Sequence, residues 1–544
     1  MSEPEPRLHN TRSKAEIKAA KTEKKLWLGG GCTKLEIMQV FIAQALGVQV
    51  NKVLVRVKRL GGGFGGKETR AVPLACACAV AARKTGRPVR YMLTREEDIV
   101  WSGQRHPFLG KWKIGVNKDG MIKALDVDLY NNGGWSTDLS QAVLERGMSH
   151  VDGCYQIPNV AVRGLICKTN TAIVEFNKMN KWKQRGLAII PTKFGISFTA
   201  LFLNQAGALV HIYHDGSILV AHGGVEMGQG LHTKMTQIAA DALNVPLESI
   251  FIAETSTNTV ANASATAASA SSDLNGFAIY NACQQLNERL APYREKLGPE
   301  ATMEKLAHAA YFDRVNLSAQ GFYKTPEIGY EWGTNRGKMF FYFTQGVTAA
   351  EVEVDTLTGS WTCLRADIKM DVGQSINPAI DYGQIEGAFV QGMGLFTMEE
   401  SLWLRGGPMK GALFTRGPGA YKIPGFRDVP QVFNVRLLKD VEWKELRTIQ
   451  RSRGVGEPPL FMGSAVFFAI RDALKAARSK YGVEAASVKS AGGVRQTEDG
   501  AYAGLLHLES PATTERIRLA CEDPIMRATK VTPKDGEQSF FVYI

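Results

Sequence analysis

The stretch RLGGGFGGKET, residues 59–69, decides how the first part of this chain folds. It follows an alternating run at residues 53–60, which predicts a strand, and it precedes a run of small residues at 72–83, which predicts a helix. A glycine loop between a strand and a helix is the usual place where backbone N–H groups bind an anion. Five glycines in six positions also let the main chain approach a ligand closely.

Two nucleotide-binding patterns match this loop only in part. The dinucleotide fingerprint G-x-G-x-x-G matches residues 61–66, but residues 80–91 lack the acid that it needs about 20 positions later. The phosphate loop G-x-x-x-x-G-K-[ST] matches through Lys67, but Glu68 stands where a hydroxyl should be, and its charge would repel phosphate. A tight structural turn is a third open interpretation.

Other glycine-rich segments each present a polar side chain, namely HGGVEMGQGLHTK (222–234), DYGQIEGAFVQGMG (381–394) and GVGEPPLF (454–461). Four supporting stretches are LSQAVLERGMSH (139–150), IPTKFGISFTA (190–200), TSTNTVANASATAAS (255–269) and TRGPGAYKIP (415–424). In this order, and together with GGGFGGKE, they closely resemble the molybdenum-cofactor half of the xanthine dehydrogenase and aldehyde oxidase family. The resemblance implies a molybdenum–molybdopterin cofactor, with no protein side chain bound directly to the metal.

Mixed strand and helix patterns predict an α+β fold. Turn signals at Asp119-Gly120 and Asp215-Gly216 predict hairpins, and helices are expected at residues 35–46 and 232–243. The resemblance implies two elongated mixed α/β molybdopterin-binding domains with the cofactor between them. We expect a disordered basic lead at residues 1–28, an incomplete first domain at 29–172, a second domain at 173–525, and a C-terminal tail at 526–544.

Composition excludes several classes of function. The chain has 544 residues, 44% hydrophobic and 22% charged, and no apolar run approaches the ~20 residues that span a membrane. The net charge of +12 is dispersed and accompanied by no nucleic-acid-binding motif, so we expect no nucleic-acid partner. The eight cysteines form no C-x-x-C pair, which argues against zinc or iron–sulfur ligation and favours reduced thiols in the cytoplasm, with a peroxisomal location as the alternative.

Glu457 is the candidate catalytic residue. It stands between Gly456, which leaves room for a ligand, and two prolines that stiffen the backbone after it. A bound high-valent metal acidifies its water, and a nearby carboxylate can take the proton. By resemblance, Glu457 is this base. The alternative is a surface glutamate on a turn.

The candidate substrate residues are Glu68, Arg146, Phe198 and Thr199. Glu68 and Arg146 match positions that bind the purine in xanthine-oxidising members of the family, and a carboxylate with a guanidinium suits a ring that carries carbonyls and N–H groups. Phe198 matches one ring of a substrate sandwich, and Thr199 follows it. The alternatives are an ion pair within the helix for Arg146 and strand core for Phe198.

Positions that match cofactor contacts in the family come from four segments of the chain. They are the backbone of Phe64, Gly65, Ala267 and Ala268, and the side chains of Gln229 and Gln384.

The sequence also departs from the family pattern. Residues 167–172 run directly into IVEFNKMNKWKQRG, where the family has a second glycine loop that contains Phe-Arg-Gly-Phe-Gly-Gly, so we expect an internal deletion of several dozen residues. Residues 444–453 and 488–502 also read unlike the family. We find no 2Fe-2S or FAD region, which leaves a homodimer or a partner chain carrying those groups as the expected partners.

The sequence therefore predicts a truncated polypeptide that resembles xanthine dehydrogenase. The activity that this implies is oxidative hydroxylation of hypoxanthine and xanthine towards urate. The alternatives are an enzyme that resembles aldehyde oxidase and a catalytically inactive fragment.

Overall fold

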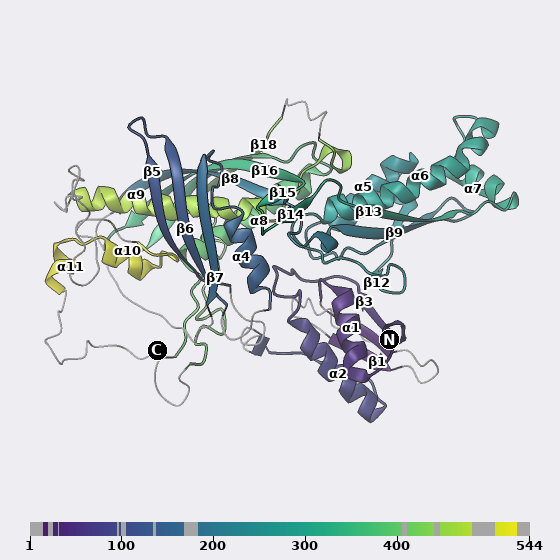
Figure 1. Cartoon of the computed structure of the whole chain (residues 1–544), viewed down its shortest axis with the longest axis horizontal. Helices are drawn as coiled ribbons and strands as arrows, with labels where there is room; N and C mark the ends of the chain where they lie inside the picture. Colours follow the sequence, from purple (N-terminus) through teal and green to yellow (C-terminus); the bar gives the residue numbers. More distant parts are fainter. Residues whose placement is uncertain are drawn as a thin grey trace, which may run out of the picture.

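The computed structural model confirms the α+β class (Figure 1). It describes residues 15–19, 26–30, 32–94, 97–98, 105–133, 138–167, 183–404, 411–439, 446–480, 506 and 508–529. Several predictions fall outside these residues. They concern most of the lead, the junction after Cys167, residues 488–502, and the tail beyond residue 529. The predicted domain boundaries are not tested by the fold and stay predictions.

The glycine loop belongs to a five-stranded sheet with the strand order β12-β3-β2-β1-β4. The strands are β1 (Ala15–Ala19), β2 (Leu26–Gly30), β3 (Val53–Val57), β4 (Val89–Tyr91) and β12 (Thr255–Ser256). Helices α1 (Leu35–Leu46) and α2 (Ala71–Thr85) pack on each other, with α1 covering β3, whose Val55 is fully buried, and α2 packing on β1 and β4. The predicted strand, loop and helix are thus confirmed, with the strand ending at Val57.

The expectation of disorder up to residue 28 is wrong where the structure describes this segment. Strand β1 pairs antiparallel with β2, and β2 pairs parallel with β3. The charged composition around these strands predicted disorder, but β3 offers them an edge for hydrogen bonding, and a sheet edge attracts a strand largely independently of its side chains.

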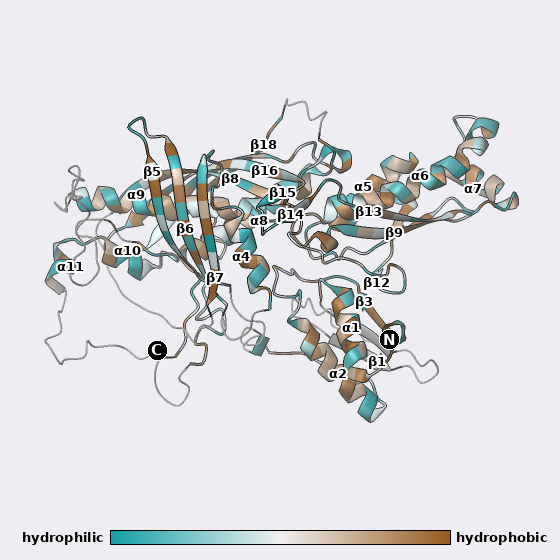
Figure 2. Cartoon of the chain, in the orientation of Figure 1, coloured by the Kyte–Doolittle hydropathy of each residue, from teal (hydrophilic) through white to brown (hydrophobic). Residues whose placement is uncertain are grey.

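A second unit is the three-stranded sheet β5-β6-β7, with β5 at Phe108–Val116, β6 at Ile122–Asn132 and β7 at Asn159–Cys167. The predicted turn joins β5 to β6, and Gly120 adopts a positive φ of 80° there. Helix α4 (Ser140–Met148) packs against one end of the sheet, beside Gly164. Hydrophobic and hydrophilic residues alternate along the strands (Figure 2), and β5 leaves Trp112 largely exposed.

The third unit is the sheet β11-β10-β9-β13 with its helices. Its members are β9 (Gln205–Ile212), β10 (Ile218–His222), β11 (Ile250–Ile252), β13 (Ser318–Lys324), α5 (Leu231–Leu243), α6 (Ser271–Leu297) and α7 (Met303–Phe312). Helix α6 can lie close to β13 because of Gly321, where an added Cβ would come 1.8 Å from the carbonyl oxygen of Ala278. The predicted hairpin at Gly216 and the predicted helix α5 are confirmed.

The fourth unit is the central sheet β18-β17-β16-β8. Its strands are β8 (Lys183–Ile196), β16 (Tyr342–Asp355), β17 (Trp361–Asp371) and β18 (Val432–Leu437). The accompanying elements are α8 (Pro378–Thr397), the 3₁₀ helix η5 (Pro458–Gly463), α9 (Ser464–Lys480), α10 (Thr514–Ala520), α11 (Pro524–Thr529) and the hairpin β14 (Gly329–Glu331) with β15 (Arg336–Lys338). Helix α9 packs along β8, where a Cβ on Gly186 would meet the carbonyl oxygen of Ala469 at 2.1 Å.

A buried ion pair joins the third and fourth units. Lys234 of α5 places its Nζ 2.6 Å from Oδ1 of Asp381 on α8, and both side chains are less than 10% exposed. Ser375 Oγ donates a hydrogen bond to the other oxygen of Asp381 at 2.6 Å. The side chain of Ile380 fills the space beside Gly230 at the start of α5. Together these contacts fix the N-terminal ends of the two helices against each other.

All eight cysteines have free thiols. Within the described part of the chain, no helix combines the length and the apolar character that crossing a bilayer requires.

We predict that Lys234→Met destabilises the chain by about 3–5 kcal/mol, because the carboxylate of Asp381 would stay buried without its cation. Urea unfolding measures this loss. The matched control is Lys183→Met, which removes an equally close partner of Glu353 at 2.6 Å from a site where the lysine is 70% exposed. That variant should lose less than ~1 kcal/mol. Equal small losses in both variants would contradict the role given to the buried pair.

Candidate functional site

The loop between β3 and α2 exposes its backbone. Phe64 adopts a positive φ of 50° and is 79% exposed, and Gly65 follows with a φ of 81°. Two hydrogen bonds hold the ends of the loop. Leu60 N donates to Glu226 O at 3.0 Å, and Thr33 N donates to Lys67 O at 3.0 Å. The loop is therefore fixed at its base and open at its tip.

A second glycine loop, residues 223–230, packs against the first. An added Cβ on Gly63 would come 3.0 Å from Sδ of Met227, so any larger residue would have to displace that side chain. The side chain of Gln229 is used within its own loop. Its Nε2 donates to Val225 O at 3.0 Å and its Oε1 accepts from Met227 N at 2.8 Å.

The carboxylate of Glu226 organises the second loop. Its Oε1 accepts hydrogen bonds from the N–H groups of Gly228 (2.9 Å) and Gly230 (3.1 Å), and its Oε2 accepts from His232 N at 3.0 Å. Glu226 is only 6% exposed. Sequence reasoning missed this residue, although a single carboxylate inside the glycine run GGVEMGQG was a usable signal.

A third loop, residues 265–269, closes against the first two. The hydroxyl oxygen of Thr266 accepts from Val225 N at 2.9 Å, and Thr266 N donates to Thr33 O at 3.2 Å. Ala268 and Ser269 both have positive φ angles, 57° and 53°. Consecutive left-handed residues other than glycine are strained and occur mainly where a backbone is held in a particular pose for function.

Glu457 meets the third loop directly. Ser269 Oγ donates to Oε2 of Glu457 at 2.8 Å and accepts from the backbone N–H of Glu457 at 2.9 Å. Glu457 is exposed and immediately precedes η5. That helix touches α8 so closely that a Cβ on Gly392 would lie 1.9 Å from Leu460 O. Glu457 does lie on a turn at the surface, but its carboxylate is oriented by a specific partner.

The structure brings Glu68, Arg146 and Glu457 to one region. Burial raises the pKa of the Glu68 carboxyl, Lys34 at 3.8 Å opposes this shift, and the charge of Glu457 adds to it. Burial lowers the pKa of the Arg146 guanidinium, and Glu457 again acts on it, in the opposite direction. The charge of Glu457 therefore raises the pKa values of both candidate substrate residues, Glu68 and Arg146.

Arg146 lies on α4 and reaches the end of β8. Its two terminal nitrogens donate to the carbonyl oxygens of Gly195 at 2.7 Å and Ser197 at 2.8 Å. Its guanidinium lies over the rings of Phe194 and Phe340, with distances of 5.1 and 5.2 Å to the ring centres. In the described structure, these contacts replace the intrahelical ion pair that was the alternative for this residue.

The remaining candidates lie around these loops. Phe198 is 9% exposed and belongs to the hydrophobic core around β9 and α6, and Thr199 beside it is half-buried. Gln384 lies one helical turn after Ile380, whose side chain fills the space beside Gly230, so Gln384 is on the face of α8 towards the second loop. The roles of these residues, and those of Ala267 and Ala268, stay predictions.

The glycine loops can accept a ligand held by backbone groups. A Cβ built on Gly65 or on Gly228 would meet nothing within 4 Å, so both segments border open space. Among the described residues, no group of three His, Cys, Asp or Glu side chains is arranged to hold a metal ion. The open space beside the glycine loops is therefore the place where a ligand could approach their main chain, and the part that backbone N–H groups play in binding it stays a prediction.

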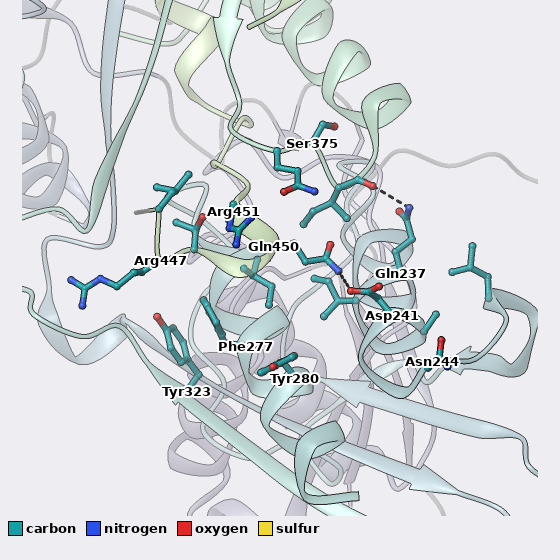
Figure 3. A pocket seen from close by; sticks show the side chains of 18 of the residues that line it. Gln237, Asp241, Asn244, Phe277, Tyr280, Tyr323, Ser375, Arg447, Gln450 and Arg451 are labelled. Atoms are coloured by element: carbon teal, nitrogen blue, oxygen red, sulfur yellow. Dashed lines mark hydrogen bonds between the residues drawn. The ribbon is translucent and has the colours of Figure 1, made fainter. Parts of the chain in front are cut away.

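A separate cavity of about 1270 Å³ lies between α5, α6 and residues 446–451 (Figure 3). Gln450 Nε2 donates to Oδ2 of Asp241 at its wall, at 2.9 Å. None of the predicted site residues lines this cavity. The glycine loops and the cavity are therefore distinct features of the surface.

We predict that Glu226→Gln lowers the free energy of unfolding by about 2–3 kcal/mol, because an amide NH₂ group would face a backbone N–H donor that the carboxylate now satisfies. Urea denaturation gives the value. Glu254→Gln is the control, since Glu254 is 41% exposed and pairs with Arg56 at 3.3 Å near the surface. The control should cost less than ~1 kcal/mol. A loss at Glu226 no larger than that of the control would argue against its organising role.

The chain is similar to several known proteins. Residues 16–178 and residues 166–430 each match a molybdopterin cofactor-binding domain. The chain is 60% identical to the xanthine dehydrogenase of Emericella nidulans over 583 aligned positions, which cover 93% of this chain and 41% of that relative. It is 49% identical to the nicotinate hydroxylase hnxS of the same organism, again over 93% of this chain and 41% of the relative.

The aldehyde oxidoreductase of Desulfovibrio gigas has the same fold, with a TM-score of 0.76 at 20% identity over 94% of this chain and 59% of that one. The chain spans only about two fifths of the length of the curated relatives that it matches. The alignment with the Emericella protein is also longer than the 544 residues of the chain, so it opens gaps in this sequence, as an internal deletion requires. With its two molybdopterin cofactor-binding domains, the chain belongs to the xanthine dehydrogenase family.

Proposed function

We propose that the chain forms the molybdopterin-binding part of a xanthine dehydrogenase-like hydroxylase that oxidises hypoxanthine and xanthine towards urate. The observation that carries this proposal is that Glu457 contacts the third loop through Ser269 and that its charge acts on the pKa values of both Glu68, at the end of the first loop, and Arg146. A base, an acceptor and a fork of donors are the three groups that hydroxylation of an oxygen-bearing purine ring needs.

The cofactor would be held mainly by main chain. The loop tip at Phe64 and Gly65 is exposed and borders open space, and the backbone at Ala268 is left-handed. When bound, molybdenum–molybdopterin would accept the two electrons that leave the substrate carbon. The residues proposed to hold it are Phe64, Gly65, Gln229, Ala267, Ala268 and Gln384.

Glu457 is proposed to take the proton from the attacking oxygen nucleophile. The hydrogen bond from Ser269 orients Oε2, and the backbone N–H of Glu457 on the same hydroxyl fixes the position of its Cα. A carboxylate oriented in this way needs no rearrangement before it accepts a proton.

Glu68 and Arg146 are proposed to bind the purine. A guanidinium has five N–H donors, so the two hydrogen bonds to Gly195 O and Ser197 O leave donors for a ring carbonyl. Burial raises the pKa of Glu68, which favours sharing of a proton between this carboxyl and a ring nitrogen. Phe198 and Thr199 would form the wall beside the ring.

Two alternatives are favoured by specific observations. The chain is 49% identical to a protein named for the hydroxylation of nicotinate, so similarity at this level does not fix the substrate. An aldehyde or another heteroaromatic compound is therefore the competing substrate class. The gaps in the alignment with the Emericella protein favour a catalytically inactive fragment, because a missing cofactor loop weakens cofactor binding. We also propose that the chain forms a homodimer or binds a partner chain that carries 2Fe-2S and FAD. The proposed location is the cytoplasm or the peroxisome.

The first test combines metal analysis with the variant Glu457→Gln. We expect less than one molybdenum per chain and, in the loaded fraction, purine oxidation with a dye as electron acceptor. The variant keeps the shape of the side chain but removes the base, so turnover per molybdenum should fall at least ~100-fold. Glu226 is unsuited as a control because it shapes the loop, whereas Glu254→Gln should keep full turnover. Unchanged turnover of Glu457→Gln with bound metal would exclude the assigned role, and no molybdenum at all would favour the inactive fragment.

The second test distinguishes purine from aldehyde as substrate. Arg146→Met should reduce kcat/KM for xanthine by a factor that corresponds to ~2–4 kcal/mol, because a ring carbonyl would lose its donor in a dry site. The effect on an aromatic aldehyde should be much smaller. Arg163→Met, which removes an exposed partner of Asp126 at 3.0 Å, is the control for loss of an arginine. Equal losses on both substrates would show that Arg146 only supports the end of β8.

A further inference from the structure

Strand β16 holds the segment that leads to Glu457. Tyr342 Oη accepts a hydrogen bond from Gly454 N at 2.8 Å, and Thr344 Oγ1 donates to Gly454 O at 2.8 Å. The two side chains are two positions apart and therefore on the same face of the strand. Tyr342 is 9% exposed and Thr344 is fully buried. Both backbone polar groups of Gly454 are thus held by side chains of one strand.

A buried carboxylate completes the arrangement. Tyr342 Oη donates to Oδ2 of Asp273 at 2.7 Å, and the N–H of Ile449 donates to Oδ1 at 3.1 Å. Burial raises the pKa of Asp273 to about 6, while the two hydrogen bonds act in the opposite direction. The pKa of the Tyr342 phenol is also raised well above its ordinary value by burial, so the hydroxyl keeps the proton that it donates.

Asp273 lies at the start of α6, four residues after Ser269. Ser269 contacts Glu457, and Tyr342, which is itself bonded to Asp273, holds Gly454. The contact is close, since an added Cβ on Gly454 would come 2.5 Å from Ser269 O. Glu457 is only three positions after Gly454, so a displacement of one moves the other.

We propose that Asp273 and Tyr342 are positioning residues that set the place of the Glu457 carboxylate relative to the third loop. The inference rests on the proposed function, because it concerns the base of that reaction. Neither side chain is one of the proposed substrate or cofactor contacts. Their effect on catalysis passes through Gly454, and misplacement of a catalytic group by about 1 Å can cost ~100-fold in rate.

The test uses Tyr342→Phe in the full chain, with Tyr293→Phe as its matched control. Tyr293 lies on α6 and, like Tyr342, donates its hydroxyl to an aspartate, Asp313, at 3.0 Å, but it is only half-buried. Hydrogen–deuterium exchange of the peptide that contains residues 453–457 is the readout that needs no activity. We expect the Gly454 amide to exchange at least ~10-fold faster in Tyr342→Phe and at the wild-type rate in the control.

Kinetics of the molybdenum-loaded fraction with a dye acceptor give the second readout. Tyr342→Phe should lower kcat about 10-fold and change KM less than about 2-fold, because the base moves while the substrate contacts stay in place. If the exchange and kinetics of Tyr342→Phe matched those of Tyr293→Phe, the proposal would be overturned. Unchanged exchange of residues 453–457 would overturn it as well, whatever the kinetics show.

A second variant keeps the inference testable if Tyr342→Phe does not fold. Thr344→Val has nearly the same shape and removes only the donor to Gly454 O, so faster exchange at residues 453–457 supports the proposal and unchanged exchange refutes it. The exchange measurement also separates this inference from the proposed function. If Glu457→Gln keeps full turnover, the proposed function fails, and exchange alone then decides whether Tyr342 holds the segment.

Discussion

The geometry of the site depends on one constraint, which is that the backbone N–H groups of a loop made largely of glycine need acceptors if the loop is to keep one conformation. The carboxylate of Glu226 meets this need for three N–H groups at once. Through its carbonyl oxygen, the same residue also accepts the hydrogen bond from Leu60 that ties the first loop to the second. Without such acceptors the loops could not be both glycine-rich and fixed.

The loops in turn decide which side chains meet. They come from positions separated by up to several hundred residues, and short hydrogen bonds through Thr33, Thr266 and Ser269 connect them. This arrangement lets a rigid backbone surface and a few charged side chains share one region. Specific chemistry then depends on where the carboxylates of Glu68 and Glu457 and the guanidinium of Arg146 point, and the fold supports each of them from a different element.

The buried polar groups outside the loops act at the joints between units. Lys234 and Asp381 fix α5 against α8, while Asp273 and Tyr342 connect α6 with β16. Burying one member of either pair without the other costs free energy, and burial becomes favourable only when both members are in place. Such pairs make the relative position of the units specific in a way that apolar contacts, which tolerate sliding, do not.

Local patterns in the sequence were sufficient for the strand, loop and helix around residues 59–69, for both hairpin turns and for α5, because periodicity and turn residues act over a few neighbouring positions. Glu68, Arg146 and Glu457 were selected by the family resemblance rather than by local patterns, and their roles stay predictions. The local patterns failed at residues 15–19 and 26–28, where a neighbouring sheet edge overrode a charged composition. Only the tertiary structure decided the partners of Arg146, the three hydrogen bonds to Glu226 and the contact between Asp273 and Tyr342. Apart from Glu226, whose partners follow it within six residues, these contacts join side chains to residues about 50 or more positions away, and no local period records them.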